Sequence, residues 1–250
     1  MLGMTRWPAT ADELVEQQLV LAAAGDAALT SGPWQVPPVS GPRPLWGGCF
    51  IAFASGEAGP GHAGDRAWAA AVTMYALDRA QEEALIKGTT GAAYLPGLLA
   101  LREGPLLATA LGALHRPPDV VLVDATGRDH PRRAGMALHL GAVMGIPSVG
   151  VTHRPLQAKG QPPAQQRGAT SPLHLGDEEV ARWVCTRTGA RPVVAHAAWR
   201  TDPATAALVV LMASTTGART PAPLREARRL ARETRAVAEG RAPEGRAPDV

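Results

Sequence analysis

The chain has 250 residues and is 46% hydrophobic, which suffices to bury one sizeable core in a single α/β domain. Its 25 Lys and Arg residues against 22 Asp and Glu residues leave a net charge of +3, and an isoelectric point of about 9.3 indicates a mild preference for acidic partners. No membrane-length apolar run and no apolar signal stretch are present, and both cysteines stand in apolar segments. We therefore expect a cytoplasmic protein with no membrane partner.

The chain is predicted to begin with a capped helix. Thr10 followed by Glu13 is a capping-box signature, and the helical periodicity that follows ends near Gly25. The prolines of residues 31–44 exclude regular structure there and indicate a surface connector. Two β-rich segments come next, and the Gly-rich turn between them predicts an antiparallel hairpin of residues 46–54 and 66–77.

A helix is predicted over residues 103–114, with Glu103 at its start, where the helix dipole favours a carboxylate. The following segment has the pattern of a strand, a loop, a helix and a second strand, at residues 120–123, 125–131, 133–144 and 146–151. Such a unit is parallel and right-handed, and ligands bind beyond the carboxyl ends of its strands. Asp124 and His153 both fall at that edge.

The last third of the chain is predicted to add strands at residues 180–187 and 191–195, a helix after Pro203, and an Arg-rich final helix. Four arginines of that helix share one stripe: Arg225, Arg228, Arg232 and Arg235. The fold class is therefore α/β, with a central mixed sheet flanked by helices. We expect one domain over residues 1–239 and a disordered tail over residues 240–250.

Several short motifs follow one another along the chain. They are a Tyr-x-Pro-Gly motif followed by Arg-Glu, a Val-Asp-x-x-Gly motif followed by His-Pro-Arg, and the motifs His-Leu-Gly and Ile-Pro-x-x-Gly-Val. Their residues are Tyr94, Pro96, Gly97, Arg102, Glu103, Val123, Asp124, Gly127, His130, Pro131, Arg132, His139, Leu140, Gly141, Ile146, Pro147, Gly150 and Val151. In this order the motifs resemble the endonuclease V family, nucleases that cut DNA or RNA near inosine, and the resemblance extends from about Ala11 to Arg235.

This resemblance implies a ribonuclease H-like fold and a metal-dependent phosphodiester hydrolysis near deaminated purines, in DNA repair. By analogy, Mg²⁺, or Mn²⁺ in its place, would be held weakly by Asp124 and Glu103, and the catalytic residues would be Glu103, Asp124 and His153. The residues expected to contact nucleic acid, DNA or RNA containing inosine, are Tyr94, Leu95, Pro96, Gly97, Arg102, Gly127 and His130. Tyr94 with Leu95 would form a strand-separating wedge that stacks on an unpaired base.

Four departures from the family's pattern fall at positions assigned to the site. Phe50 stands where the family has an Asp on its first strand, His153 where it has a Lys, Trp199 where it has a His, and Ala125 where it has a Gly. Phosphodiester hydrolysis of this type needs a hard cation held by carboxylates, and only two remain. We expect reduced or lost catalysis, with Glu57 or Asp65 as remote substitutes for the missing ligand.

Plainer readings remain open for each of these residues. Asp124 could be an N-cap or turn residue, and Glu103 a solvated charge in the first turn of a helix. His139 could be a histidine packed in the core. His130 fits a loop surface, Tyr94 a buried loop position, and the arginine stripe a solvated helix face. Phe50 and Trp199 are predicted to pack against each other in place of a lost metal site. Two functions besides nuclease activity stay open: nucleic-acid binding without cleavage, and a pocket reused for a small ligand or a protein partner.

Overall fold

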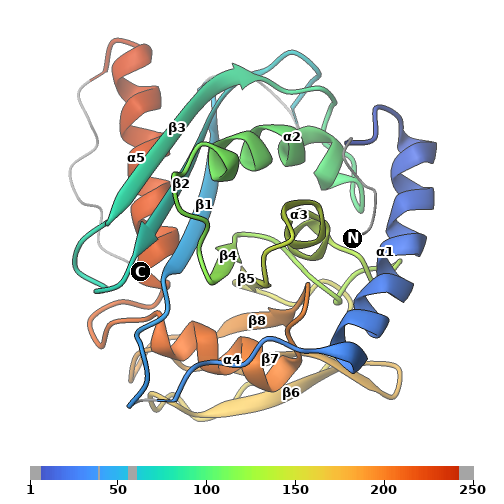
Figure 1. Cartoon of the computed structure of the whole chain (residues 1–250), viewed down its shortest axis with the longest axis vertical. Helices are drawn as coiled ribbons and strands as arrows, with labels where there is room; N and C mark the ends of the chain where they lie inside the picture. Colours follow the sequence, from blue (N-terminus) through green and yellow to red (C-terminus); the bar gives the residue numbers. More distant parts are fainter. Residues whose placement is uncertain (1–6, 39, 56–60, 242–250) are drawn as a thin grey trace.

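The computed structural model describes residues 7–38, 40–55 and 61–241, and its centre is an eight-stranded sheet in the order β3-β2-β1-β4-β5-β8-β7-β6 (Figure 1). The strands are β1 (Trp46–Phe53), β2 (Arg66–Met74), β3 (Glu82–Thr89), β4 (Val120–Val123), β5 (Ser148–Thr152), β6 (Thr170–Leu175), β7 (Glu178–Val184) and β8 (Val193–Ala197). Neighbours β1, β4 and β5 are parallel, whereas β2 and β3 on one side and β8, β7 and β6 on the other pair antiparallel. The predicted mixed sheet is confirmed.

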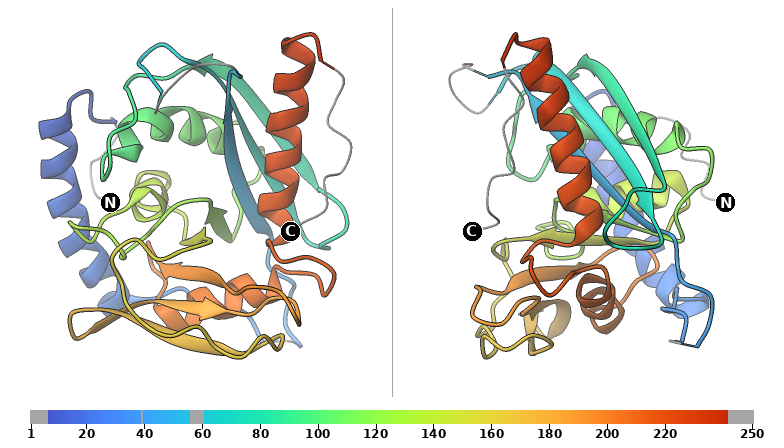
Figure 2. Two further views of the ribbon diagram at one scale, coloured as in Figure 1. Left: turned by 180° about the vertical axis from the view of Figure 1, so that it is seen from behind. Right: turned by 90° about the vertical axis from the view of Figure 1, so that its left-hand side faces the viewer.

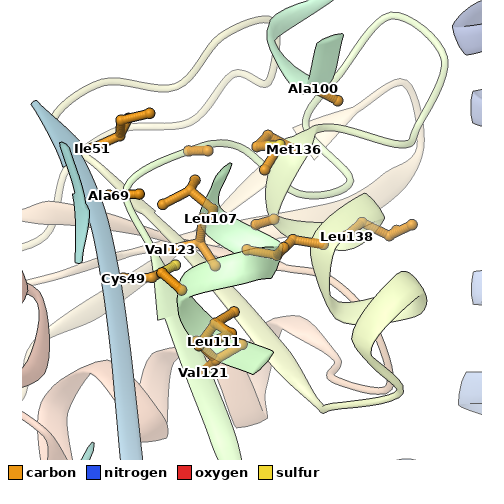
Figure 3. Packing of buried hydrophobic residues seen from close by; sticks show 14 of the residues in the cluster. Cys49, Ile51, Ala69, Ala100, Leu107, Leu111, Val121, Val123, Met136 and Leu138 are labelled. Carbon is orange, nitrogen blue, oxygen red and sulfur yellow. The ribbon is translucent and has the colours of Figure 1, made fainter. Parts of the chain in front are cut away.

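Helices cover both faces of this sheet (Figure 2). The helices are α1 (Ala11–Ser31), α2 (Leu99–Gly112), α3 (Met136–Met144), α4 (Pro203–Met212) and α5 (Ala222–Ala238). Alternate residues of β4 face opposite cores, because successive side chains of a strand point to opposite faces. Val121 and Val123 pack with α2 and α3 (Figure 3), and Val120 and Leu122 pack with α4 and α5. α1 packs on α2 and α3 rather than on the sheet.

Several predicted elements are confirmed, and others needed correction. The capping box of Thr10 and Glu13 is present, but α1 continues past Gly25 to Ser31. Gly25 is a buried packing position: a Cβ there would lie 3.3 Å from the Arg128 guanidinium and 3.4 Å from Leu138. α2 begins at Leu99, so Glu103 lies in its second turn and not at its start. The strands β3 and β6 were not predicted.

Three expectations from the sequence remain: a disordered C-terminal tail, a single domain and the lack of a membrane partner. Residues 242–250 of the predicted tail lie outside the described residues, and one domain over residues 1–239 stays a prediction. Among the helices that the structure describes, none is long and apolar enough to span a membrane.

His139 of α3 is a fully buried histidine whose ring stacks on Trp7, with ring centroids 4.7 Å apart. Neither ring nitrogen has a hydrogen-bond partner, and burial lowers the pKa of His139 to about 4. The unfolded chain binds this proton near pH 6.5 and the folded chain only near pH 4, so folding stability falls as the pH drops through that window.

We therefore expect the wild type to lose, through His139 alone, on the order of 2 kcal/mol of unfolding free energy between pH 7 and pH 5. The variant His139→Leu should lose correspondingly less, as measured by urea denaturation at both pH values. His130 and His196, which are also buried with pKa values lowered to about 4, stay in both proteins, so the variant keeps part of the acid sensitivity. An identical pH dependence for the two proteins would contradict this account of His139.

Candidate active site

A cavity of about 320 Å³ lies where the carboxyl ends of the parallel strands β1 and β4 meet the side of α2. Parallel sheets bind ligands at this edge. The cavity is lined by Cys49, Phe50, Ile51, Phe53, Glu103, Leu107, Val123 and Asp124. The structure therefore brings together Glu103 and Asp124, two of the three residues predicted to be catalytic, in one pocket.

Phe50 lies directly beside Asp124. Cys49 pairs with Val123 in the β1–β4 register, so the next residues of the two strands are neighbours with side chains on the same face. That face is the one covered by α5, and the guanidinium carbons of Arg228 and Arg232 lie 5.2 and 5.6 Å from the centre of the Phe50 ring. An aromatic ring thus occupies the strand position from which a carboxylate would reach toward Asp124.

Glu103 enters the cavity from α2, on the other face of the sheet. Burial and, to a smaller extent, the negative charge of Asp124 raise the pKa of Glu103 to about 8, although the positive charge of Arg102 acts in the opposite direction. At neutral pH the Glu103 side chain is therefore mostly protonated. Burial also raises the pKa of the Cys49 thiol, with contributions from Glu103 and Asp124, so Cys49 is no thiolate ligand either.

Asp124 forms an ion pair with Arg228, whose Nη2 donates to Oδ2 at 2.9 Å. Within residues 7–38, 40–55 and 61–241, no group of three or more His, Cys, Asp or Glu side chains is arranged to hold a metal ion. With Glu103 protonated, Asp124 paired to a guanidinium and Phe50 unable to coordinate, the residues present do not fit a divalent metal.

The other three departures from the family's pattern, Ala125, His153 and Trp199, lie outside this cavity. Ser148 N–H donates to the Trp199 carbonyl at 3.0 Å, and Trp199 N–H donates to Ser148 Oγ at 3.1 Å. Ser148 begins β5, so Trp199 is at the opposite edge of the sheet, and its predicted packing against Phe50 is wrong. Ala125 is buried in the apolar core beneath α3. His153 follows β5 as an exposed residue at the correct edge, though it does not line the cavity.

Neither Glu57 nor Asp65 is seen to replace the missing first-strand carboxylate. Glu57 lies outside the described residues. Asp65 is buried, and its Oδ2 accepts from Arg102 Nη2 at 2.6 Å and from His62 N–H at 2.7 Å. Asp65 is therefore held in an internal ion pair with Arg102 and does not line the cavity.

The loop of Tyr94, Leu95, Pro96 and Gly97 projects beside the N-terminus of α2, with Tyr94 41% and Leu95 47% exposed. Its backbone is anchored at Gly97, whose carbonyl accepts from Gln18 Nε2 at 3.0 Å and Arg132 Nη2 at 2.9 Å. Gly97 has φ +77°, a conformation that glycine adopts without strain. An exposed aromatic on an anchored loop suits the predicted wedge better than a buried loop position.

The remaining residues predicted to contact nucleic acid are buried. His130 is 3% exposed and its Nε2 lies 3.2 Å from the Gly97 carbonyl, so it supports the Tyr94 loop from below. Burial and, to a smaller extent, the positive charge of Arg132 lower the pKa of His130 to about 4, so the ring is neutral at pH 7. At Gly127 a Cβ would lie 2.1 Å from the Ala197 carbonyl. Arg102 is 4% exposed and donates to the carbonyls of His62 and Ala92 and to the Asp65 carboxylate.

Sequence reasoning missed Arg228 as the partner of Asp124. The sequence places the four arginines on one stripe and leaves a solvated helix face open as its plainer reading, whereas Arg228 and Arg232 lie over the Phe50 ring of β1 and Arg235 Nη1 donates to the Phe53 carbonyl at 3.4 Å. Their i, i+4 spacing marks one face of α5, which is a usable signal only once the packing partner of that face is known.

Comparison with known proteins identifies related sequences and structures. A model of the family "Endonuclease V" matches residues 48–229. Endonuclease V of Streptomyces coelicolor is 48% identical over 111 residues, 44% of this chain and 48% of that protein, so the match spans about half the length of this relative. The crystal structure of endonuclease V from Streptomyces avermitilis superposes with a TM-score of 0.74 at 33% identity and covers 94% of this chain and 96% of that chain.

A more distant structure has the same fold. Endonuclease V of Ciona intestinalis, in complex with a 24mer DNA containing an inosine followed by a ribo-adenosine, has a TM-score of 0.68 at 19% identity and covers 90% of this chain and 98% of that chain. These superpositions confirm the ribonuclease H-like fold expected from the sequence.

Proposed function

The chain belongs to the endonuclease V family, and from this premise we propose that it binds inosine-containing nucleic acid and cleaves it slowly or not at all. The observation that carries the proposal is Phe50 beside Asp124, because the ring takes the strand position from which a second carboxylate would approach the reacting phosphate. Hydrolysis of a phosphodiester requires charge neutralisation at the phosphate and an activated water, usually by a bound metal. Phe50 supports neither.

The exposed loop with Tyr94 and Leu95 supports the binding half of the proposal. A tyrosine ring and an apolar side chain that project from an anchored loop can stack on an unpaired base, whatever its identity. The Ciona relative is seen bound to inosine-containing DNA. We carry this binding over to the present chain as part of the proposal, with DNA and RNA both as candidates, and a cytoplasmic location stays a prediction.

The alternative function is slow cleavage with a weakly bound Mg²⁺ or Mn²⁺. Members of the family generally depend on a divalent metal ion. The observation that favours this alternative is that Asp124 and Glu103 line the same cavity, and Mg²⁺ in proteins is often held by only one or two carboxylates with water and substrate phosphate. Residual activity would then require displacement of Arg228 from Asp124 and loss of the Glu103 proton.

The experiment that tests the proposal measures cleavage and binding on one deoxyinosine-containing oligonucleotide and one matched inosine-containing RNA. We expect binding with little or no product in Mg²⁺ or Mn²⁺. Product that appears with the wild type and vanishes in Asp124→Ala would establish the alternative. If the oligonucleotides are neither bound nor cut, both the proposed function and the alternative are wrong. The remaining hypothesis is then that the cavity binds a small ligand or a protein partner.

Replacing the wedge residue should weaken binding without loss of stability. Stacking of a base on an aromatic side chain contributes about 1–3 kcal/mol, so Tyr94→Ala is expected to raise Kd roughly 5- to 150-fold in fluorescence anisotropy. The matched control is Leu208→Ala, since Leu208 is 46% exposed on α4, which covers the other face of the sheet. Equal affinities of the two variants would remove Tyr94 from the proposed interface.

A further inference from the structure

We infer that the Arg228 guanidinium takes the place of a divalent cation beside Asp124, so that the carboxylate at the sheet edge is neutralised by the chain itself. The inference concerns the same site as the proposed function and rests on it. Arg228 and Asp124 are 104 residues apart in sequence, and Nη2 lies 2.9 Å from Oδ2. A guanidinium–carboxylate contact at this distance is charge-assisted and satisfies the carboxylate oxygen that a metal would need.

The packing of α5 on β1 aims Arg228 at this edge. α5 lies along β1 and β2 (Figure 2). At Gly48 a Cβ would lie 2.4 Å from the backbone of Pro223, so only glycine lets the first turn of α5 approach β1 this closely. The helix then runs toward the carboxyl end of β1, and Arg228 and Arg232, one turn apart, reach the Phe50 ring.

The Phe50 ring makes the surroundings of Asp124 more favourable for a guanidinium than for a divalent ion. The face of an aromatic ring carries partial negative charge and attracts a flat, weakly hydrated cation such as Arg, with which it can stack. A small divalent ion instead requires oxygen ligands, which a phenyl ring lacks. Phe50, Arg228 and Asp124 therefore form a consistent set, with the ring below the guanidinium and the carboxylate at its edge. A +2 ion at Asp124 would also be repelled by Arg228.

Metal binding at Asp124 meets two obstacles, and removal of both should raise the affinity more than removal of either one. Phe50→Asp alone adds a carboxylate but leaves the Arg228 charge in place, and Arg228→Gln alone removes the charge but leaves the phenyl ring. The double variant Phe50→Asp/Arg228→Gln has three carboxyl groups at one edge, counting Glu103, and lacks the guanidinium that pairs with Asp124. We expect the double variant to bind Mn²⁺ at least 10-fold more tightly than the wild type or either single variant.

The test is a Mn²⁺ titration of the full chain, followed by electron paramagnetic resonance of the free ion and without nucleic acid. Arg228→Lys keeps a positive charge and should bind no more Mn²⁺ than the wild type, also when combined with Phe50→Asp. The matched control is Arg232→Gln, one turn along the same face, which combined with Phe50→Asp should fall short of the Arg228 double variant. Thermal melts of every variant identify those that fold.

Two results would overturn the inference: a wild type that binds Mn²⁺ as tightly as the double variant, or a folded double variant that binds it no better than the wild type. If the double variant does not fold, Arg228→Gln against Arg228→Lys decides, since only the former removes the charge and should gain Mn²⁺ affinity. The proposed function is tested independently by oligonucleotide binding: it fails if the wild type does not bind the inosine-containing oligonucleotides.

Discussion

Arg102→Met is expected to lower the unfolding free energy by about 3–5 kcal/mol, because it leaves the buried carboxylate of Asp65 without its partner. Arg102 and Asp65 are 4% and 7% exposed, and their ion pair measures 2.6 Å. The same guanidinium donates from Nη1 to the carbonyls of His62 at 2.8 Å and Ala92 at 3.0 Å and stacks over the Phe53 ring. One side chain thus fastens the loop before β2 and the segment before α2 to each other.

Urea denaturation with a far-UV circular dichroism signal measures this loss. The double variant Asp65→Asn/Arg102→Met should recover part of it, because no charge is then left buried without a partner. If Arg102 instead contacts phosphate, Arg102→Met will weaken oligonucleotide binding while the urea midpoint stays unchanged. That result would contradict the structural role of Arg102 and support the role inferred from the family's Arg-Glu motif.

The motifs identified the family more reliably than they identified surface residues. Arg102, Gly127 and His130 belong to recognisable motifs, yet each is buried and contacts this chain. A motif records that a residue type is needed at a position, without saying whether the need comes from a ligand or from packing. Only exposure separates the two cases, and only Tyr94, Leu95 and Pro96 of the predicted contact residues are exposed.

The centre of the fold was predictable because its signals are local. β4 is an apolar run, VVLV, and β5 has the β-branched residues Val149, Val151 and Thr152; between them lies a helix that Gly145 ends with φ +68°. The missed strands lie at the two ends of the sheet, where a strand has one neighbour. β3 has no buried residue, and β6 contains Pro172, so neither shows a continuous buried pattern, and each is held by backbone pairing to its neighbour.

The candidate site was predictable only in part, for a related reason. Asp124 is the residue after a buried strand, and this local pattern places it at the carboxyl edge. Its partner Arg228 is 104 residues away on a helix whose arginines look alike in sequence. The choice among them depends on how closely α5 approaches Gly48, which is a tertiary property.

Asp129→Ala is expected to lower the unfolding free energy by roughly 2–5 kcal/mol, because it removes the charged acceptor of three backbone N–H groups, of which that of Ala158 is buried. The fully buried carboxylate of Asp129 accepts from Leu156 at 2.7 Å, Gln157 at 2.9 Å and Ala158 at 2.8 Å. These bonds tie the segment after β5, which carries His153, to the loop after β4. Urea denaturation measures the loss, and amide hydrogen exchange should show faster exchange at these three residues.

Asp202→Ala is the matched control, because Asp202 also accepts backbone N–H with a carboxylate but has only one such bond, from Thr205 at 2.6 Å at the N-cap of α4. Loss of an N-cap costs about 1 kcal/mol, so the Asp129 variant should lose several times more stability than the Asp202 variant. Equal losses would show that the three N–H groups find water when Asp129 is removed. In that case the segment that carries His153 is held by its own packing, and Asp129 does not determine where His153 lies relative to Asp124.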